Sequence, residues 1–127
     1  MWYVRCMRGL LLSGLPLILN IHLPMASGAT IGNVASFTTS GQDVTFNISD
    51  ASKVRITLLT ADTARVRVAP TGTFITNISR AVVNTNYPAV PFTVTDGGSQ
   101  VTLATSAMQL VCRKSPFVLE CRDASGG

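Results

Sequence analysis

Six carboxylates are the side chains of this 127-residue sequence with the most obvious catalytic chemistry. Two carboxylates that face each other can act as a general acid and as a base or nucleophile. Asp62, Asp96 and Asp123, however, stand at predicted turns, where an Asp side chain normally accepts hydrogen bonds from nearby backbone. We interpret these three as turn residues. The remaining carboxylates are Asp43 and two others (Asp50, Glu120), and we predict no catalytic residue among the six.

Few other residues could act as a catalytic group or a metal ligand. The single histidine, His22, lies in an N-terminal segment that we expect to be removed. Without it the chain has no Ser-His or Cys-His nucleophile pair and no usual zinc site. Gly97-Gly98 is predicted to form a hairpin turn and not a phosphate-binding loop. We therefore predict no metal and no cofactor.

The first 29 residues have the pattern of a secretory signal peptide. Arg5 and Arg8 give a basic start, residues 10–19 are apolar, and Ser27-Gly28-Ala29 is a small-x-small cleavage site. A membrane anchor is the competing interpretation, but a span needs about 20 apolar residues, and polar residues and prolines interrupt this run. We predict cleavage after Ala29, a secreted or periplasmic product (residues 30–127), and no membrane association after cleavage.

The remaining part carries eight Lys and Arg residues against six acids, because Arg5 and Arg8 are two of the ten basic residues. These charges are spread over several predicted strands. Nucleic-acid binding needs basic residues clustered on one face, so we predict no nucleic-acid partner.

From residue 33 onward, apolar residues recur at every second position. Such alternation, with many Val, Ile and Thr residues, is typical of half-buried antiparallel strands. We predict an all-β chain with about eight short strands and no helix, forming an antiparallel β-sandwich over roughly residues 33–123. The predicted core residues are Val54, Ile56, Leu58, Val66, Val68, Phe92, Val94, Val101, Leu103, Leu110, Phe117 and Leu119.

Residues 71–89 form a connection too long for a tight turn, and such connections usually carry function or cross between sheets. Tyr87 and Phe74 lie here, outside the strand patterns. One tyrosine on a long loop is a poor platform for a sugar, so we cannot assign carbohydrate-binding residues. Asn47 and Asn77 begin Asn-Ile-Ser glycosylation sequons, which matter only in a host that glycosylates.

Cys112 and Cys121 invite a disulfide in an exported chain. If Lys114-Ser115 is a two-residue hairpin loop, Cys112 lies opposite Phe117 and Cys121 lies opposite Met108. The two sulfurs are then about 13 Å apart, whereas a disulfide needs Cα atoms within about 7 Å. We predict two buried free thiols.

Three stretches together resemble a known family: "VRITLLTADTARVRVAPTGTF", "YPAVPFTVTDGG" and "VTLATSAMQLVCRKSPFVLECRDASG". They are similar, in order and spacing, to the opening of secreted glycoside hydrolase family 31 (GH31) enzymes, the α-glucosidase and α-xylosidase group. The resemblance covers roughly residues 54–127. The matching positions are Arg65, Val66, Arg67, Pro70, Thr105, Leu110, Lys114, Pro116, Phe117, Asp123 and Gly126.

The resemblance implies a galactose-mutarotase-like β-sandwich that precedes a catalytic (β/α)₈ barrel. The family's catalytic aspartates lie on that barrel, and neither their motif nor the family's "Y-G-L-G-E" segment occurs here. We therefore expect residues 30–127 to be a truncated, non-catalytic N-terminal domain. Its partners would be the missing barrel of the same polypeptide and, through the full-length enzyme, an oligo- or polysaccharide. The alternatives are a self-contained secreted sandwich that binds carbohydrate, and an adhesion or structural module.

Overall fold

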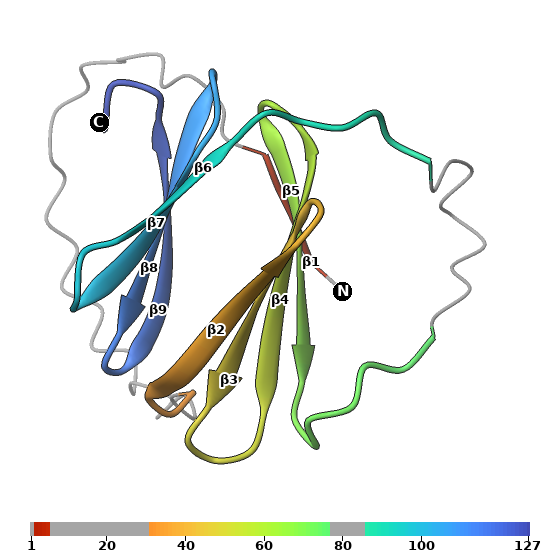
Figure 1. Cartoon of the computed structure of the whole chain (residues 1–127), viewed down its shortest axis with the longest axis vertical. Coiled ribbons are helices and arrows are strands. Elements are labelled where there is room, and N and C mark those ends of the chain that lie inside the picture. Colours follow the sequence, from red (N-terminus) through yellow and green to blue (C-terminus); the bar gives the residue numbers. More distant parts are fainter. Residues whose placement is uncertain (1, 6–30, 77–85) are drawn as a thin grey trace, which may run out of the picture.

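The structure, a computed structural model, describes residues 2–5, 31–76 and 86–127 (Figure 1). This part of the chain contains strands and no helix, and so no helix that could cross a membrane. The strands are β1 (Trp2–Arg5), β2 (Val34–Ser40), β3 (Asp43–Ile48), β4 (Lys53–Thr60), β5 (Thr63–Ala69), β6 (Thr93–Asp96), β7 (Gln100–Ala104), β8 (Met108–Lys114) and β9 (Phe117–Asp123).

The strands form two antiparallel sheets. The five-stranded sheet has the order β1-β5-β4-β3-β2, and the four-stranded sheet has the order β6-β7-β8-β9. Figure 1 shows the two sheets facing each other, with the residue 86–92 connection leading from one to the other. The predicted all-β antiparallel sandwich is confirmed, and β2 to β9 fall within the predicted range of residues.

The core lies between the two sheets and is built from alternate residues of each strand. Every second residue of strand β3 is buried, and the same alternation holds along most of β4 and β7. The rings of Phe46 on β3 and Phe117 on β9 meet across the layer with centroids 5.4 Å apart. Fully or nearly fully buried side chains are Val44, Phe46, Ile48, Val54, Ile56, Leu58, Ala64, Val101, Leu103, Met108, Leu110, Cys112 and Phe117.

Hydrogen bonds tie the two sheets together at both ends of β4. At one end the Phe117 backbone N–H donates to the Gly32 carbonyl over 3.1 Å, and the Ser115 hydroxyl bonds the side chain of Asn33 over 3.1 Å. At the other end the Thr105 hydroxyl donates to the carbonyl of Ala61. These contacts fix the position of one sheet over the other.

The predicted core is confirmed at most positions and wrong at one. Seven of the predicted side chains are buried, and Val66, Phe92, Val94 and Leu119 are partly buried against the core. Val68, however, is 45% exposed, so its predicted burial is wrong. Val68 lies on β5, two residues beyond Val66, which is the last β5 residue that pairs with β1. It is not part of the core cluster.

The predicted register of the last hairpin is wrong by two residues. Lys114 pairs with Phe117, so Ser115-Pro116 is the loop, and Cys112 lies opposite Leu119. Proline has no N–H to donate to a ladder, which favours its place in the turn. Cys112 is a buried free thiol, as predicted.

Cys121 is disulfide-bonded, so its predicted free thiol is wrong. Because Cys112 is free, the partner of Cys121 lies outside the described residues. The distance argument excluded only a bridge between Cys112 and Cys121, and Cys6, the remaining cysteine of the sequence, was expected to be removed with residues 1–29.

Strand β1 belongs to the segment that we predict to be a signal peptide. Its backbone pairs with β5, from Trp2 opposite Val66 to Arg5 opposite Thr63. The predicted cleavage point after Ala29 lies outside the described residues, and cleavage stays a prediction. It would remove both β1 and Cys6, and would leave β5 as the edge of its sheet.

We expect Ile56→Ala to lower the free energy of unfolding of the full chain by about 2–5 kcal/mol, because Ile56 is completely buried and its loss leaves a cavity. Val68→Ala is the matched control: this side chain belongs to the same sheet but is 45% exposed. We expect it to cost about 1 kcal/mol or less. Urea denaturation followed by circular dichroism measures both, and equal losses would contradict the position of the core.

Candidate functional site

The outer face of the five-stranded sheet carries its charged side chains. Strand alternation that turns Val54 and Ile56 inward turns Arg55 and Thr57 outward. Asp43 connects these two: it accepts a hydrogen bond of 2.5 Å from the Thr57 hydroxyl and pairs with Arg55 over 3.9 Å. Polar contacts therefore order the side chains of this face.

The chain after β5 folds back over this face. The Phe74 ring lies under two guanidinium groups, with the Arg55 carbon 4.2 Å and the Arg67 carbon 5.5 Å from its centroid. The fold-back begins at Gly72, which has a φ of +77° and no room for a side chain, since a Cβ would lie 2.7 Å from the carbonyl oxygen of Ala51. The two arginines thus hold Phe74 against the sheet.

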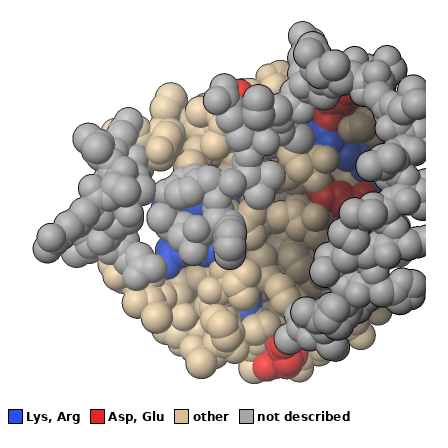
Figure 2. Space-filling model, turned by 180° about the vertical axis from the view of Figure 1, so that it is seen from behind, with Lys and Arg blue, Asp and Glu red and all other residues tan. Residues whose placement is uncertain are grey.

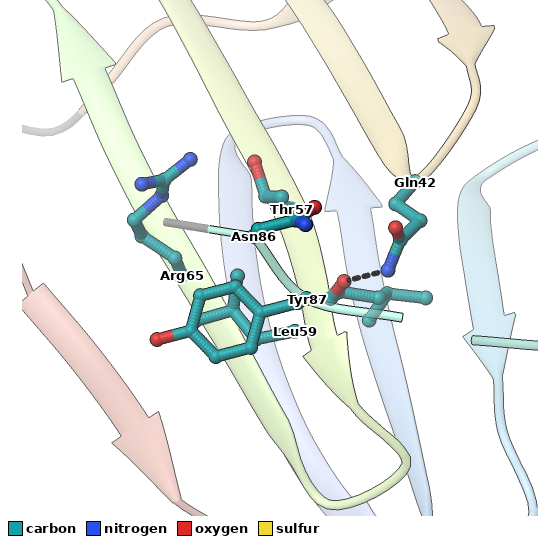
Figure 3. A pocket seen from close by; sticks show the side chains of 7 residues that line it. Gln42, Thr57, Leu59, Arg65, Asn86 and Tyr87 are labelled. Atoms are coloured by element: carbon teal, nitrogen blue, oxygen red, sulfur yellow. Dashed lines mark hydrogen bonds between the residues drawn. The ribbon is translucent and has the colours of Figure 1, made fainter. Parts of the chain in front are cut away.

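Beside this stack is a pocket of about 230 Å³ (Figure 3). In Figure 3 the Tyr87 ring lies over Leu59, and the polar ends of Arg65, Thr57 and Asn86 lie on one side of it. Its lining combines β4, β5, the β2–β3 turn and the connection between the sheets, and consists of Gln42, Thr57, Leu58, Leu59, Arg65, Asn86 and Tyr87.

Gln42 fixes the wall of the pocket. Its amide nitrogen donates to the carbonyl oxygen of Leu58 over 2.6 Å and to that of Pro88 over 3.2 Å. The two bonds use both N–H groups of the amide and attach the connection to the sheet. Within the described residues no group donates a hydrogen bond to the amide oxygen of Gln42, so this oxygen can accept from another partner.

Arg65 lines the pocket and carries a buried N–H donor that has no hydrogen-bond acceptor within the described residues. Within the described residues its Nε atom is shielded from solvent and makes no hydrogen bond. Leaving a buried donor unpaired costs about 1–3 kcal/mol, and such groups are uncommon in folded proteins. The position therefore suits an acceptor from outside the described chain.

The carboxylates do not meet at this pocket. The three predicted turn aspartates do bond locally, as expected: Asp62 accepts from Thr60 over 2.6 Å, Asp96 from the Gly98 backbone over 2.9 Å, and Asp123 from the Ser125 backbone over 2.9 Å. A hydrogen bond from Lys114 lowers the pKa of Asp96 below its usual value.

The other carboxylates also have partners. The Ser52 hydroxyl bonds Asp50 over 2.5 Å and lowers its pKa. Glu120, on the outer face of the four-stranded sheet, pairs with Arg122 over 2.8 Å and with Arg113, and these contacts lower its pKa. Among the described residues, no group of three His, Cys, Asp or Glu side chains could hold a metal ion.

Charge is mixed on the face shown in Figure 2. Acidic and basic side chains lie together in one cluster, and elsewhere they are scattered over a surface that is mostly uncharged. The absence of a nucleic-acid partner stays a prediction.

The sequence alone did not identify this pocket. The alternation predicted that Arg65 faces outward, but it did not predict that its Nε atom would be buried. Gln42 lies in a turn, and no sequence pattern indicated a role for it. Tyr87 was recognised as lying outside the strand patterns, but not as part of this pocket. Of the two sequons, Asn47 bonds the Ser36 hydroxyl over 2.9 Å, and Asn77 lies outside the described residues.

No protein-family model matches the sequence, and a search of curated proteins finds no relative. Solved structures do match. A GH31 dextranase from Flavobacterium johnsoniae, complexed with glucose, has a TM-score of 0.69 and 23% identity over 78% of this chain and 12% of the dextranase. The cycloalternan-forming enzyme from Listeria monocytogenes, in complex with a pentasaccharide substrate, has a TM-score of 0.61 and 24% identity over 76% of this chain and 9% of the enzyme.

These likenesses show the fold. The chain has the β-sandwich fold of a segment found in carbohydrate-active enzymes, and it spans about a tenth of their length. The resemblance to GH31 enzymes drawn from the sequence is confirmed at the level of the fold.

We expect Cys112 to be unreactive in the native chain. Burial raises its pKa from 9.0 to about 12, so the nucleophilic thiolate is scarce near about pH 8. Iodoacetamide should leave Cys112 unmodified in buffer and modify it in urea, as peptide mapping can show. Between about pH 9 and 12 the unfolded thiol loses its proton first, so the free energy of unfolding should fall with rising pH. Rapid native labelling would contradict its place in the core.

Proposed function

We propose that this chain is the non-catalytic N-terminal β-sandwich segment of a secreted α-glycosidase of family 31. The observation that carries the proposal is the ratio of the two coverages: 78% of this chain matches only 12% of a GH31 dextranase. We infer that a segment of that size would pack against the catalytic domain of the whole enzyme. The signal pattern of residues 1–29 favours export.

The open edges of both sheets agree with this proposal. β9, seven residues long, pairs with β8 only, and within the described residues its outer side has no partner. Removal of the predicted signal peptide would open the seven-residue β5 in the same way. Long exposed edges invite pairing with further strands, which the rest of a longer polypeptide would supply.

A second candidate is a self-contained secreted sandwich that binds carbohydrate. One observation favours it: the described strands already bury a continuous core, with Phe46, Ile56 and Leu103 completely enclosed. The two candidates differ in whether further polypeptide is needed for a stable fold and for activity.

We expect the purified 127-residue chain to show no hydrolysis of an aryl α-glucoside, because each described carboxylate is engaged in a turn or an ion pair. A polypeptide extended by the downstream reading frame should hydrolyse it. The opposing result is a rate in the short chain that survives purification and disappears in Asp43→Asn or another carboxylate variant. A downstream frame without a catalytic barrel would also favour the self-contained module.

A further inference from the structure

We propose that the pocket between Tyr87 and Arg65 binds a single neutral pyranose unit. This inference concerns the outer face of the five-stranded sheet and does not depend on a catalytic barrel. It rests on the size of the pocket, on its hydrogen-bonding groups and on the aromatic ring beside them.

The size of the pocket suits one sugar ring. Its volume of about 230 Å³ is below the roughly 300–1,000 Å³ typical of sites for drug-sized ligands. The lining is mostly polar, and the Tyr87 ring and the Leu59 side chain form a small apolar wall (Figure 3). A pyranose has an apolar C–H face that can lie against such a wall while its hydroxyls point to polar groups.

The polar groups include both donors and acceptors. Arg65 supplies the buried Nε–H without a partner in the described chain. Thr57 donates its proton to Asp43, which leaves lone pairs on the hydroxyl oxygen as acceptors. Gln42 uses its N–H groups on Leu58 and Pro88, which leaves its carbonyl oxygen as an acceptor.

This combination favours a sugar over an anion. A sugar hydroxyl donates one hydrogen bond and accepts others, so it can satisfy Arg65 and one of the acceptors together. An oxyanion only accepts, and it would bring negative charge against the acceptor oxygens of Thr57 and Gln42. Asp43, which is bonded to Thr57, already offsets positive charge on this face through Arg55.

The pocket is also held in place before any ligand binds. Gln42 attaches the connection at Pro88 to the end of β4 at Leu58, and Phe74 is fixed by Arg55 and Arg67 beside it. Little ordering is then needed on binding, and pre-ordered groups bind with a smaller entropic cost.

Saturation-transfer difference NMR on the full chain with methyl α-D-glucopyranoside tests the proposal. We expect transfer to the glucoside, and a loss of affinity of about tenfold in Arg65→Gln and in Tyr87→Ala, because each removes a principal contact. Arg113→Gln is the control: Arg113 is an exposed arginine on β8 of the other sheet and does not line the pocket. Its affinity should stay within about twofold.

Circular dichroism of each variant shows whether the fold is retained. Tyr87→Phe gives a second readout, since it keeps the ring and should keep binding. The proposal is wrong if the glucoside shows no transfer, if Arg113→Gln loses binding as fully as Arg65→Gln, or if sodium sulfate displaces the glucoside, which would make this an anion site. None of these results bears on whether the chain belongs to a hydrolase.

Discussion

The apolar layer between the two sheets is the constraint on which the rest of the structure depends. Each strand contributes alternate residues to it, and Phe46 and Phe117 meet across it. Burying large apolar side chains contributes about 1.5–3 kcal/mol each. Since a shift of one residue in any strand would turn its apolar side chains to solvent, this layer also fixes the registers and, through them, the polar outer faces.

The candidate site is a consequence of that arrangement. Because Ile56 and Leu58 must face inward, Thr57 and Leu59 face outward, and Arg65 lies directly opposite Thr57 on β5. The connection between the sheets has to cross this face, and Gln42 and the Arg–Phe74 stack hold it there. The pocket forms where the crossing chain places Tyr87 over Leu59.

The strands and most of the core could be predicted because they depend on local alternation, which Val54 to Leu58 shows clearly. Val68 follows the same alternation but is exposed, since burial also requires the other sheet to extend over that position. To predict the register of the hairpin at Pro116, the loop length was not enough, because the missing N–H of proline also decides which residues form the turn. Arg65, Gln42 and Tyr87 are far apart in the sequence, and no local pattern shows that a crossing connection brings them together. The bonded state of Cys121 likewise depends on residues distant in the chain.

The central claim is that residues 30–127 are one part of a larger folded unit. Without β1 this segment would leave β5 and β9, each seven residues long, as unpaired edges of their sheets. Exposed edges of this kind promote pairing between chains, and a domain of this size has only about 5–15 kcal/mol of stability to lose. The most direct measurement is thermal unfolding of residues 30–127 alone, combined with sedimentation velocity. The account predicts an aggregating segment without a cooperative transition, and a monomer that melts cooperatively and reversibly would contradict it.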